Sequence, residues 1–282
     1  MKNICITGSS GFLGQHLVRH LRSEGYALTE ITRTNGLDIC DWATVSGLKP
    51  CDVIVHLAAK TFVPDSFDNP KAFYTTNLLA TINAMELARQ WNARTIFISS
   101  YFYGPPKYLP VDETHQIHPH NPYAQTKLIS EQIIEGYCRD FKISAIALRL
   151  FNLYGPGQDD SFLIPTILNQ VNSGHVELKD PRPKRDFIHV FDVVSAIQAA
   201  IESTMIGENF QVMNLGSGKS YSVEEIVNIF SNQSSVPFTV HYSNEYRQGE
   251  VLDSVSNNSM VEHFLNWKPT VSMVEGIKTL LQ

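Results

Sequence analysis

Residues 3–14 read Asn-Ile-Cys-Ile-Thr-Gly-Ser-Ser-Gly-Phe-Leu-Gly, and this stretch decides the fold of the chain. The apolar run over 3–7 is typical of a short buried strand, and the pattern over 12–23 indicates an amphipathic helix. Between them lie the glycines of the turn, Gly8, Gly11 and Gly14. In such a turn one glycine permits a tight bend, one lets the backbone approach a bound group, and one allows close contact of helix and sheet. We therefore predict a strand–turn–helix unit that starts an α/β fold.

The same alternation of short apolar runs and longer amphipathic ones continues through the first half of the chain. Further strand-like runs fall at 27–32, 53–57, 95–99 and 144–149, and helical patterns lie at 70–90 and 122–139. Strands that alternate with helices favour βαβ units and a parallel sheet. The predicted class is α/β, with a Rossmann-type, doubly wound parallel sheet.

The turn between the first strand and the first helix is also a predicted binding site. A helix N-terminus offers free N–H groups and a partial positive charge to phosphate. Three glycines placed between the first strand and the first helix are typical of a dinucleotide site. We expect the pyrophosphate to contact the turn and the start of the helix, at Gly8, Ser10, Gly11, Phe12, Leu13 and Gly14.

The residues after the second and third strands are expected to hold the adenosine end. NAD sites usually carry a carboxylate at the end of the second strand, for the ribose 2′-hydroxyl. Here Thr32 stands at this position and Arg33 follows, which suits a 2′-phosphate. We therefore favour NADP as cofactor, with NAD as the alternative. We assign Asp38 and Ile39 to the adenine, and the small segment Leu57-Ala58-Ala59 to the face against which the dinucleotide lies.

The sequence pattern changes after Tyr154-Gly155-Pro156-Gly157. From there on the predicted elements are shorter, and Pro and Gly are more frequent. We predict a dinucleotide-binding domain over 1–155 and a smaller α/β substrate lobe over 156–282. Segment 186–202 is expected to return to the first domain, and Val271–Leu281 is expected to form a closing amphipathic helix.

Composition and charge exclude several classes of partner. The 282 residues carry a formal net charge of −6, so the chain has no overall attraction for nucleic acid or anionic lipid. It shows no signal peptide and no apolar run of transmembrane length, and its 4 cysteines lack C-x-x-C spacing, which together indicate a cytoplasmic protein. His115, His118 and His120 lie in a Pro-rich loop without a second ligand group at fixed spacing, so we expect solvated histidines and no metal.

A tyrosine and a lysine form the candidate catalytic pair. Tyr123 and Lys127 are four residues apart in the helix that opens at Pro122, so they lie on one helix face. A free tyrosine is a poor base at neutral pH, but a nearby ammonium favours the phenolate and lowers its pKa. A serine at the end of the preceding strand would hydrogen-bond a substrate oxygen beside the phenol. Such a set can pass a proton while a nicotinamide gives or takes hydride.

Together these features resemble the extended short-chain dehydrogenase/reductase family of nucleotide-sugar epimerases, dehydratases and reductases. The resemblance covers nearly the whole chain. Besides the glycine turn and Tyr123-x-x-x-Lys127, it rests on Leu148–Gly157 (LRLFNLYGPG), Arg185–Val190 (RDFIHV), Asn214–Gly218 (NLGSG) and Trp267–Thr270 (WKPT).

The resemblance implies roles for individual residues. It places the catalytic serine at Ser99, five residues before Gly104, with Tyr123 as acid/base and Lys127 at the nicotinamide ribose. It assigns Asn152, Arg185 and Arg247 to the diphosphate of a sugar nucleotide, and Asn77 to the neighbourhood of the cofactor. Ser100 and Tyr101 are expected to contact the sugar. The two long helices resemble the pair through which many relatives form homodimers.

The same comparison separates the candidate functions. Ser100 and Tyr101 stand where the 4,6-dehydratases carry Asp-Glu, which argues against dehydration. Two redox functions remain: reduction of a 4-keto (6-deoxy) sugar nucleotide, which the NADP-like Arg33 favours, and 4-epimerisation. A non-catalytic dinucleotide sensor is the alternative from another class, although such proteins typically lose the serine, tyrosine or lysine.

Overall fold

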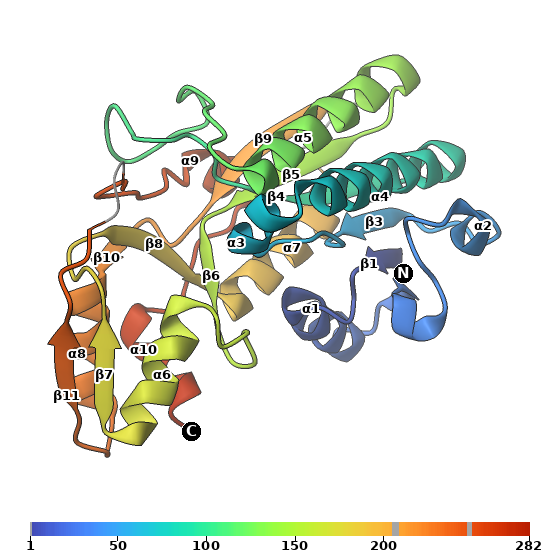
Figure 1. Ribbon diagram of the computed structural model, residues 1–282. Coiled ribbons are helices and arrows are strands. Elements are labelled where there is room, and N and C mark those ends of the chain that lie inside the picture. Colours follow the sequence, from blue (N-terminus) through green and yellow to red (C-terminus); the bar gives the residue numbers. More distant parts are fainter. Residues whose placement is uncertain (1, 205–208, 247–249) are drawn as a thin grey trace.

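Six parallel strands form the central sheet, in the order β2-β1-β3-β4-β5-β9 (Figure 1). The computed structural model describes residues 2–204, 209–246 and 250–282. The strands of this sheet are β1 (Asn3–Thr7), β2 (Ala27–Ile31), β3 (Val53–His56), β4 (Arg94–Ser100), β5 (Ala145–Leu150) and β9 (Phe210–Leu215). The predicted α/β class with a doubly wound parallel sheet is confirmed.

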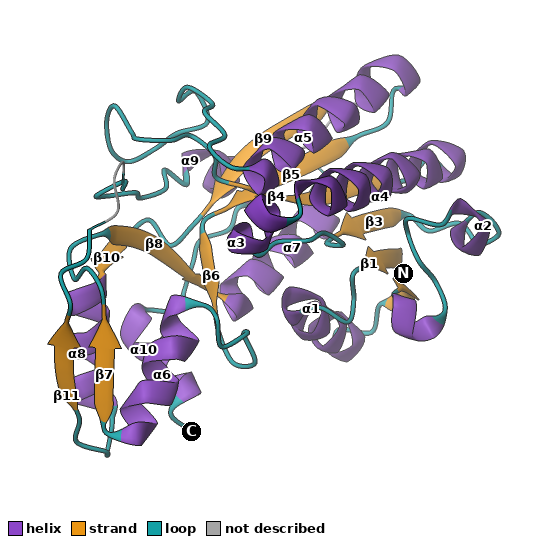
Figure 2. Cartoon of the chain, in the orientation of Figure 1, coloured by secondary structure: helices purple, strands orange, loops and turns teal. Residues whose placement is uncertain are grey.

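Helices cover both faces of this sheet, as Figure 2 shows. One face carries α4 (Pro70–Trp91) and α5 (Pro122–Phe141), which lie side by side (Figure 1). The other face carries α1 (Phe12–Ser23) and α7 (Val190–Glu202), which contact each other. The shorter elements of this part are the 3-10 turn η1 (Arg33–Asn35) and the helices α2 (Trp42–Val45), α3 (Val63–Asp68) and α9 (Ser259–Leu265).

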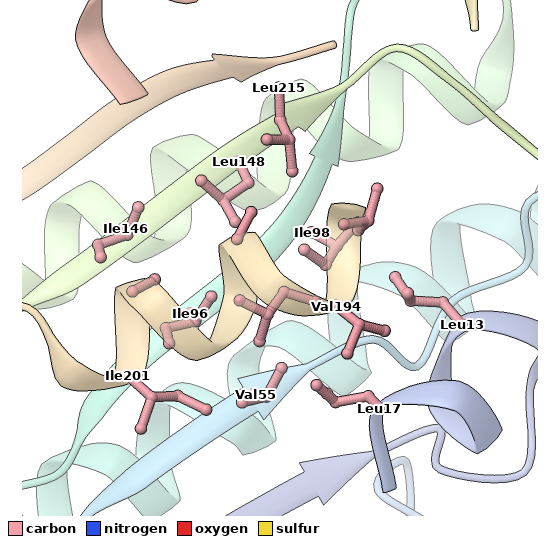
Figure 3. Packing of buried hydrophobic residues seen from close by; sticks show 14 of the residues in the cluster. Leu13, Leu17, Val55, Ile96, Ile98, Ile146, Leu148, Val194, Ile201 and Leu215 are labelled. Atoms are coloured by element: carbon pink, nitrogen blue, oxygen red, sulfur yellow. The ribbon is translucent and has the colours of Figure 1, made fainter. Parts of the chain in front are cut away.

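The core under α1 and α7 shows why the sheet is so apolar. Figure 3 shows Val194 and Ile201 of α7 directed toward Val55 and Ile96 of the sheet, with Leu17 of α1 beside them. Strands covered by helices on both faces have no solvated side, so nearly every residue is buried. Continuous apolar strands such as Ala145–Leu150, which is buried at every position, follow from this.

The second lobe has its own small core and sheets. It contains a three-stranded sheet in the order β10-β8-β6 and a two-stranded sheet of β11 and β7. Its strands are β6 (Asn152–Tyr154), β7 (His175–Leu178), β8 (Lys184–His189), β10 (Ser220–Ser222) and β11 (Thr239–Tyr242), and its helices are α6 (Leu163–Ser173), α8 (Val223–Gln233) and α10 (Met273–Leu280). Tyr154, Ile167 and Phe230 lie at the centre of its apolar cluster.

The chain crosses between the two lobes more than once. Within the segment 186–202, strand β8 belongs to the three-stranded sheet, whereas α7 packs on α1 and the central sheet. Strand β9 also joins the central sheet beside β5, a return that the sequence does not indicate. The crossings at β6 and β8 place the second lobe beyond the carboxyl ends of the parallel strands, where open α/β sheets bind ligands.

Candidate functional site

The glycine turn after β1 is shaped for a close backbone approach. Gly8 has φ +72, and a Cβ on it would lie 2.8 Å from the backbone nitrogen of Ala58. A Cβ on Gly14 would lie 2.8 Å from the carbonyl carbon of Ser9, so the first turn of α1 sits directly on the loop. Helix α1 starts after Gly11, with no side-chain cap and no acidic residue in its first turn. Its N-terminus is therefore open to an anion.

A buried hydroxyl in this turn supports the same conclusion. Ser9 is 3% exposed, and its hydroxyl finds no hydrogen-bond partner among the residues that the structure describes. Buried polar groups are normally paired, so an orphan of this kind marks a place where a ligand completes the structure. The turn therefore fits the pyrophosphate of a dinucleotide, as the sequence predicts for Gly8, Ser10, Gly11, Phe12, Leu13 and Gly14.

A cavity of about 500 Å³ opens where β2 ends. Ser10, Thr32 and Thr34 contribute hydroxyl groups to its wall, and Arg19 contributes a guanidinium. The carboxylate in this wall, Glu30, is paired with Arg22. Arg33 is exposed at the start of η1, beside this cavity.

The residues assigned to the adenine and to the middle of the cofactor occupy two loops at the same edge of the sheet. Ile39 is 6% exposed and its side chain packs in the core below α4, so only its backbone remains for a ligand. Asp38 accepts a hydrogen bond from the backbone of Cys40, at 2.9 Å. Ala58 donates its backbone N–H to the hydroxyl of Thr7, at 3.2 Å, which holds Leu57-Ala58-Ala59 against the glycine turn.

Asn77 lies against the helix that carries the predicted catalytic pair, in contact with Thr126 of α5. Its side chain is buried, and its Oδ1 accepts a hydrogen bond from the backbone of Lys60 at 2.8 Å. Its Nδ2 donates to the Lys60 carbonyl at 3.1 Å and to the hydroxyl of Thr126 at 2.9 Å. All of its donors are used within the protein, so Asn77 ties the loop after β3 to α5 rather than offering its amide to a cofactor.

Helix α5 presents the predicted tyrosine and lysine together. Its start is set by Pro122 at the first helical position and by Asn121, whose side chain accepts a hydrogen bond from Ala124 at 2.8 Å. Tyr123 and Lys127 then follow one turn apart, half-buried and buried respectively.

The ammonium of Lys127 points into the end of the sheet. It donates to the carbonyl of Ile98 at 2.7 Å and lies 4.6 Å from the ring centre of Phe97. Burial lowers the pKa of Lys127 to about 7, and the carboxylate of Glu131 opposes this shift. Nearby His56 is fully buried, and burial with the charge of Lys127 lowers its pKa to about 3, so the imidazole is neutral.

The pKa of Tyr123 differs from the expectation. Burial raises it to about 12, a hydrogen bond with Ser100 opposes the shift, and Tyr101 adds to it. The predicted lowering by the Lys127 ammonium is not seen, because that ammonium is directed to the Ile98 carbonyl. The phenol of Tyr123 therefore carries its proton at neutral pH.

The two serines at the end of β4 face opposite sides of the strand, so their hydroxyl groups have different surroundings. Ser99 is 2% exposed and donates its hydroxyl to Oε1 of Glu131 at 2.6 Å. Ser100 is half-exposed, and it is the serine whose hydroxyl lowers the pKa of Tyr123 against the effect of burial. Successive residues of a strand alternate between its two faces, so only one of these serines can reach the phenol. Counting back from Gly104 by family resemblance selects Ser99, whereas the alternation of the strand selects Ser100.

Two of the residues predicted to contact the substrate, Tyr101 and Asn152, contact each other. The ring of Tyr101 stacks on Phe151 at 4.6 Å, and its hydroxyl donates to Oδ1 of Asn152 at 3.3 Å. Nδ2 of Asn152 donates to the carbonyl of Asp186 at 3.0 Å, next to Arg185. The guanidinium of Arg185 pairs with Glu250 and donates to the Val251 carbonyl at 2.6 Å. Arg247 lies outside the described residues.

Two groups in the neighbourhood behave differently from the sequence prediction. His115, expected to be solvated, is buried, and its ring contacts the carbonyl of Tyr108 at 3.1 Å. Glu131 and Arg149, which the sequence analysis does not single out, form a buried ion pair beneath Ser99. The i,i+4 spacing of Lys127 and Glu131 on one helix face is the signal that finds the first of these two. Over the described ranges, no group of three or more His, Cys, Asp or Glu is arranged to hold a metal ion.

The comparisons with known proteins agree with this geometry. Residues 4–216 match the model of the "NAD dependent epimerase/dehydratase family". A putative UDP-glucose 4-epimerase of Methanocaldococcus jannaschii is 32% identical over 302 residues, covering 99% of this chain and 97% of its own. A GDP-6-deoxy-D-mannose reductase of Pseudomonas aeruginosa is 28% identical, covering 99% and 96%.

Solved structures superpose over nearly the entire chain. RMD from Pseudomonas aeruginosa complexed with NADPH has a TM-score of 0.91 at 26% identity, covering 100% of this chain and 98% of that one. UDP-glucose 4-epimerase with UDP-glucose from Thermotoga maritima has a TM-score of 0.90 at 26% identity, covering 99% and 97%. No helix in the described part of the chain is long and apolar enough to span a membrane. With its glycine turn, its serine–tyrosine–lysine set and these matches, the chain belongs to the NAD dependent epimerase/dehydratase family and is an enzyme.

Proposed function

We propose that this protein is an NAD(P)-dependent oxidoreductase that acts at carbon 4 of a nucleotide-diphosphate sugar, and that it reduces a 4-keto (6-deoxy) sugar nucleotide. The observation that carries the proposal is the position of Tyr123 and Lys127 one turn apart on one face of α5, with the Lys127 ammonium donating to the Ile98 carbonyl of β4 at 2.7 Å. The pKa of Tyr123 is raised to about 12, so the phenol holds the proton that a general acid has to donate.

The chain's own residues divide the chemistry among them. The dinucleotide, when bound, supplies the hydride. Tyr123 gives its phenolic proton to the oxygen on carbon 4, and Ser100 donates a hydrogen bond to the same oxygen. Lys127, one helical turn from the phenol, would hold the nicotinamide ribose with the N–H donors that the Ile98 carbonyl does not use.

Asn152 and Arg185 are proposed to hold the diphosphate of the substrate. Arg185 offers a forked guanidinium, which matches phosphate oxygens in a bidentate contact. In the structure this fork pairs with Glu250, so the diphosphate would replace the carboxylate or share the guanidinium with it. This arrangement explains how a chain of net charge −6 takes an anionic ligand.

The end of β2 supports NADP as the preferred cofactor. The cavity there is lined by hydroxyls and by Arg19, and its carboxylate Glu30 is occupied by Arg22. No carboxylate stands at Thr32, where a 2′-hydroxyl would find its acceptor.

A second candidate is 4-epimerisation, because a 32% identical relative is named a putative UDP-glucose 4-epimerase. An epimerase would use the same groups, first to remove a proton and hydride and then to return them to the other face. The two functions differ in net redox change. Reduction consumes NADPH in proportion to product, whereas epimerisation does not.

The discriminating experiment is an assay with two substrates. Incubation with a nucleotide 4-keto-6-deoxy sugar and NADPH should consume absorbance at 340 nm, with stoichiometric formation of the 4-hydroxyl product by NMR. The same protein with UDP-glucose should show no inversion at carbon 4. Flat absorbance together with inversion of UDP-glucose would replace the reductase proposal by the epimerase one.

We also propose that two copies associate through α4 and α5. These helices leave Leu79, Ile82 and Phe141 exposed on the outer layer of the molecule. Light scattering on a Leu79→Glu, Ile82→Glu variant tests this. A shift from dimer to monomer is expected, and a wild-type protein that is monomeric at micromolar concentration contradicts it.

A further inference from the structure

A buried ion pair lies directly behind the proposed reacting groups. Arg149 of β5 donates to both carboxylate oxygens of Glu131 on α5, at 3.0 and 2.7 Å, and each side chain is 5% exposed. A buried pair of this kind is weak evidence for stability, because the cost of desolvating two charges offsets much of their attraction. Its presence calls for another explanation.

The pair is the centre of a hydrogen-bond network that joins four elements. Ser99 of β4 donates to Oε1 of Glu131 at 2.6 Å. Arg149 donates to the hydroxyl of Tyr103 at 2.9 Å, and that hydroxyl donates to Oδ1 of Asn214 in β9 at 2.6 Å. Because every member has a partner, the network has one arrangement and resists small displacements.

The network touches the site at two points. Glu131 follows Lys127 by one helical turn, and Lys127 follows Tyr123 by one turn, so all three lie along one face of α5. Ser99 lies between Ser100 and Ile98 at the end of β4, and the Ile98 carbonyl accepts from the Lys127 ammonium at 2.7 Å. The contacts of Glu131 with Ser99 and Arg149 therefore fasten the reacting face of α5 to the strand end that carries Ser100.

We infer that Glu131 and Arg149 are positioning residues, which hold the phenol of Tyr123 and the ammonium of Lys127 in register with the hydroxyl of Ser100. Neither touches the reacting atoms. The inference rests on the proposed function for its kinetic consequences, and it holds for reduction and for epimerisation alike, since both use the same three groups.

The electrostatic surroundings of Lys127 give the inference a second, independent consequence. The groups that face this ammonium are the Ile98 carbonyl and the Phe97 ring of β4, the neutral His56 of β3, and Glu131 of its own helix. Glu131 raises the pKa of Lys127 against the effect of burial. Loss of that carboxylate leaves the Arg149 charge unpaired nearby, so the ammonium should lose its proton more readily.

The test starts from Glu131→Gln. We expect kcat to fall roughly 10- to 100-fold with KM little changed, because displacements of about 1 Å at a reacting group have effects of that size. In the same variant without ligands, the ¹³C NMR titration of the Lys127 side chain, assigned with Lys127→Met, should move to lower pH. Glu86→Gln is the matched control, since Glu86 pairs with Arg89 on the exposed side of α4 and should change neither readout.

A double variant covers the case in which Glu131→Gln fails to fold. Glu131→Met with Arg149→Met leaves no unpaired buried charge, so it should melt at a temperature close to wild type and still show kcat at least about tenfold lower. A folded double variant with wild-type kcat would show that the pair only stabilises the fold and would overturn the inference. So would a Lys127 titration that Glu131→Gln leaves unchanged, and this readout stands even if the wild-type protein turns over neither substrate.

Discussion

The two sides of the end of β4 carry the same residue type in neighbouring positions and behave differently. On one side Ser99 is buried, and its hydroxyl is held by Glu131 within a network whose members are protein groups. On the other side Ser100 is half-exposed, and its hydroxyl opposes the rise in the pKa of Tyr123 that burial causes. We call the buried side of β4, which carries Ser99, the closed side, and the half-exposed side, which carries Ser100, the open side.

The difference shows that burial and hydrogen-bond partners determine whether a serine hydroxyl holds the structure in place or is available to a substrate. A hydroxyl whose hydrogen bond goes to a buried carboxylate has no capacity left for a substrate oxygen, whereas a hydroxyl at the edge of a cleft has. The closed side also sets the distance between α5 and the sheet, on which the open side depends. Four measurements test whether the two sides of β4 differ in this way.

The largest effect is expected at the open side, from Tyr123→Phe. Loss of the phenolic proton should lower kcat by about 10²- to 10⁴-fold, because general acid catalysis contributes on that scale. Dinucleotide affinity, measured by the quenching of protein fluorescence, should stay within about twofold, since the ring still packs. A variant with kcat near wild type would remove Tyr123 from the chemistry.

Alanine substitutions of the two serines compare the two sides of β4 directly. Ser100→Ala should lower kcat by about 10²-fold, as the loss of one preorganised donor to a reacting oxygen does. Ser99→Ala should leave kcat close to wild type and lower the free energy of unfolding by about 1 kcal/mol, because Glu131 keeps its bidentate contact with Arg149. The reverse order of the two effects would restore the assignment made from the family spacing.

The pH dependence of the open side follows from Lys127. Burial lowers its pKa to about 7, so the ammonium is present below that pH and is lost above it, while the Tyr123 phenol stays protonated up to about 12. Reductive kcat/KM should therefore fall above pH 7, to about one tenth of its plateau at pH 8. In Lys127→Arg the guanidinium does not titrate, and residual activity should stay level over the same range.

The smallest effect is expected at the adenosine end of the cofactor, on the dissociation constant for NADPH. Arg33→Ser should raise the Kd for NADPH about fivefold, or by roughly 1 kcal/mol, since the guanidinium is exposed and screened. The Kd for NADH should not change, because that cofactor lacks the 2′-phosphate. Equal weakening of both cofactors would show that Arg33 does not recognise this phosphate.

Much of the fold could be predicted because its signals are local. The strand, glycine turn and helix over 3–23 are encoded in consecutive residues, and predicted and observed bounds of the main helices differ by at most two residues, as at 139 against Phe141. The pairing of Tyr123 with Lys127 is equally local, because the helix period alone places them on one face. The sequence does not indicate that segment 210–215 is a strand of the central sheet, since its partner Ala145–Leu150 lies far away in the chain.

Local patterns are enough to predict the α/β class, the glycine turn and the tyrosine–lysine pair, because each depends on a repeat or spacing within one element. Packing in three dimensions sets which side of β4 each serine faces, where the Lys127 ammonium points and which groups lie behind it. Those outcomes depend on the side of β4 that faces α5 and on a carboxylate and a guanidinium from separate elements, Glu131 and Arg149, that meet only when helix and strand are packed together.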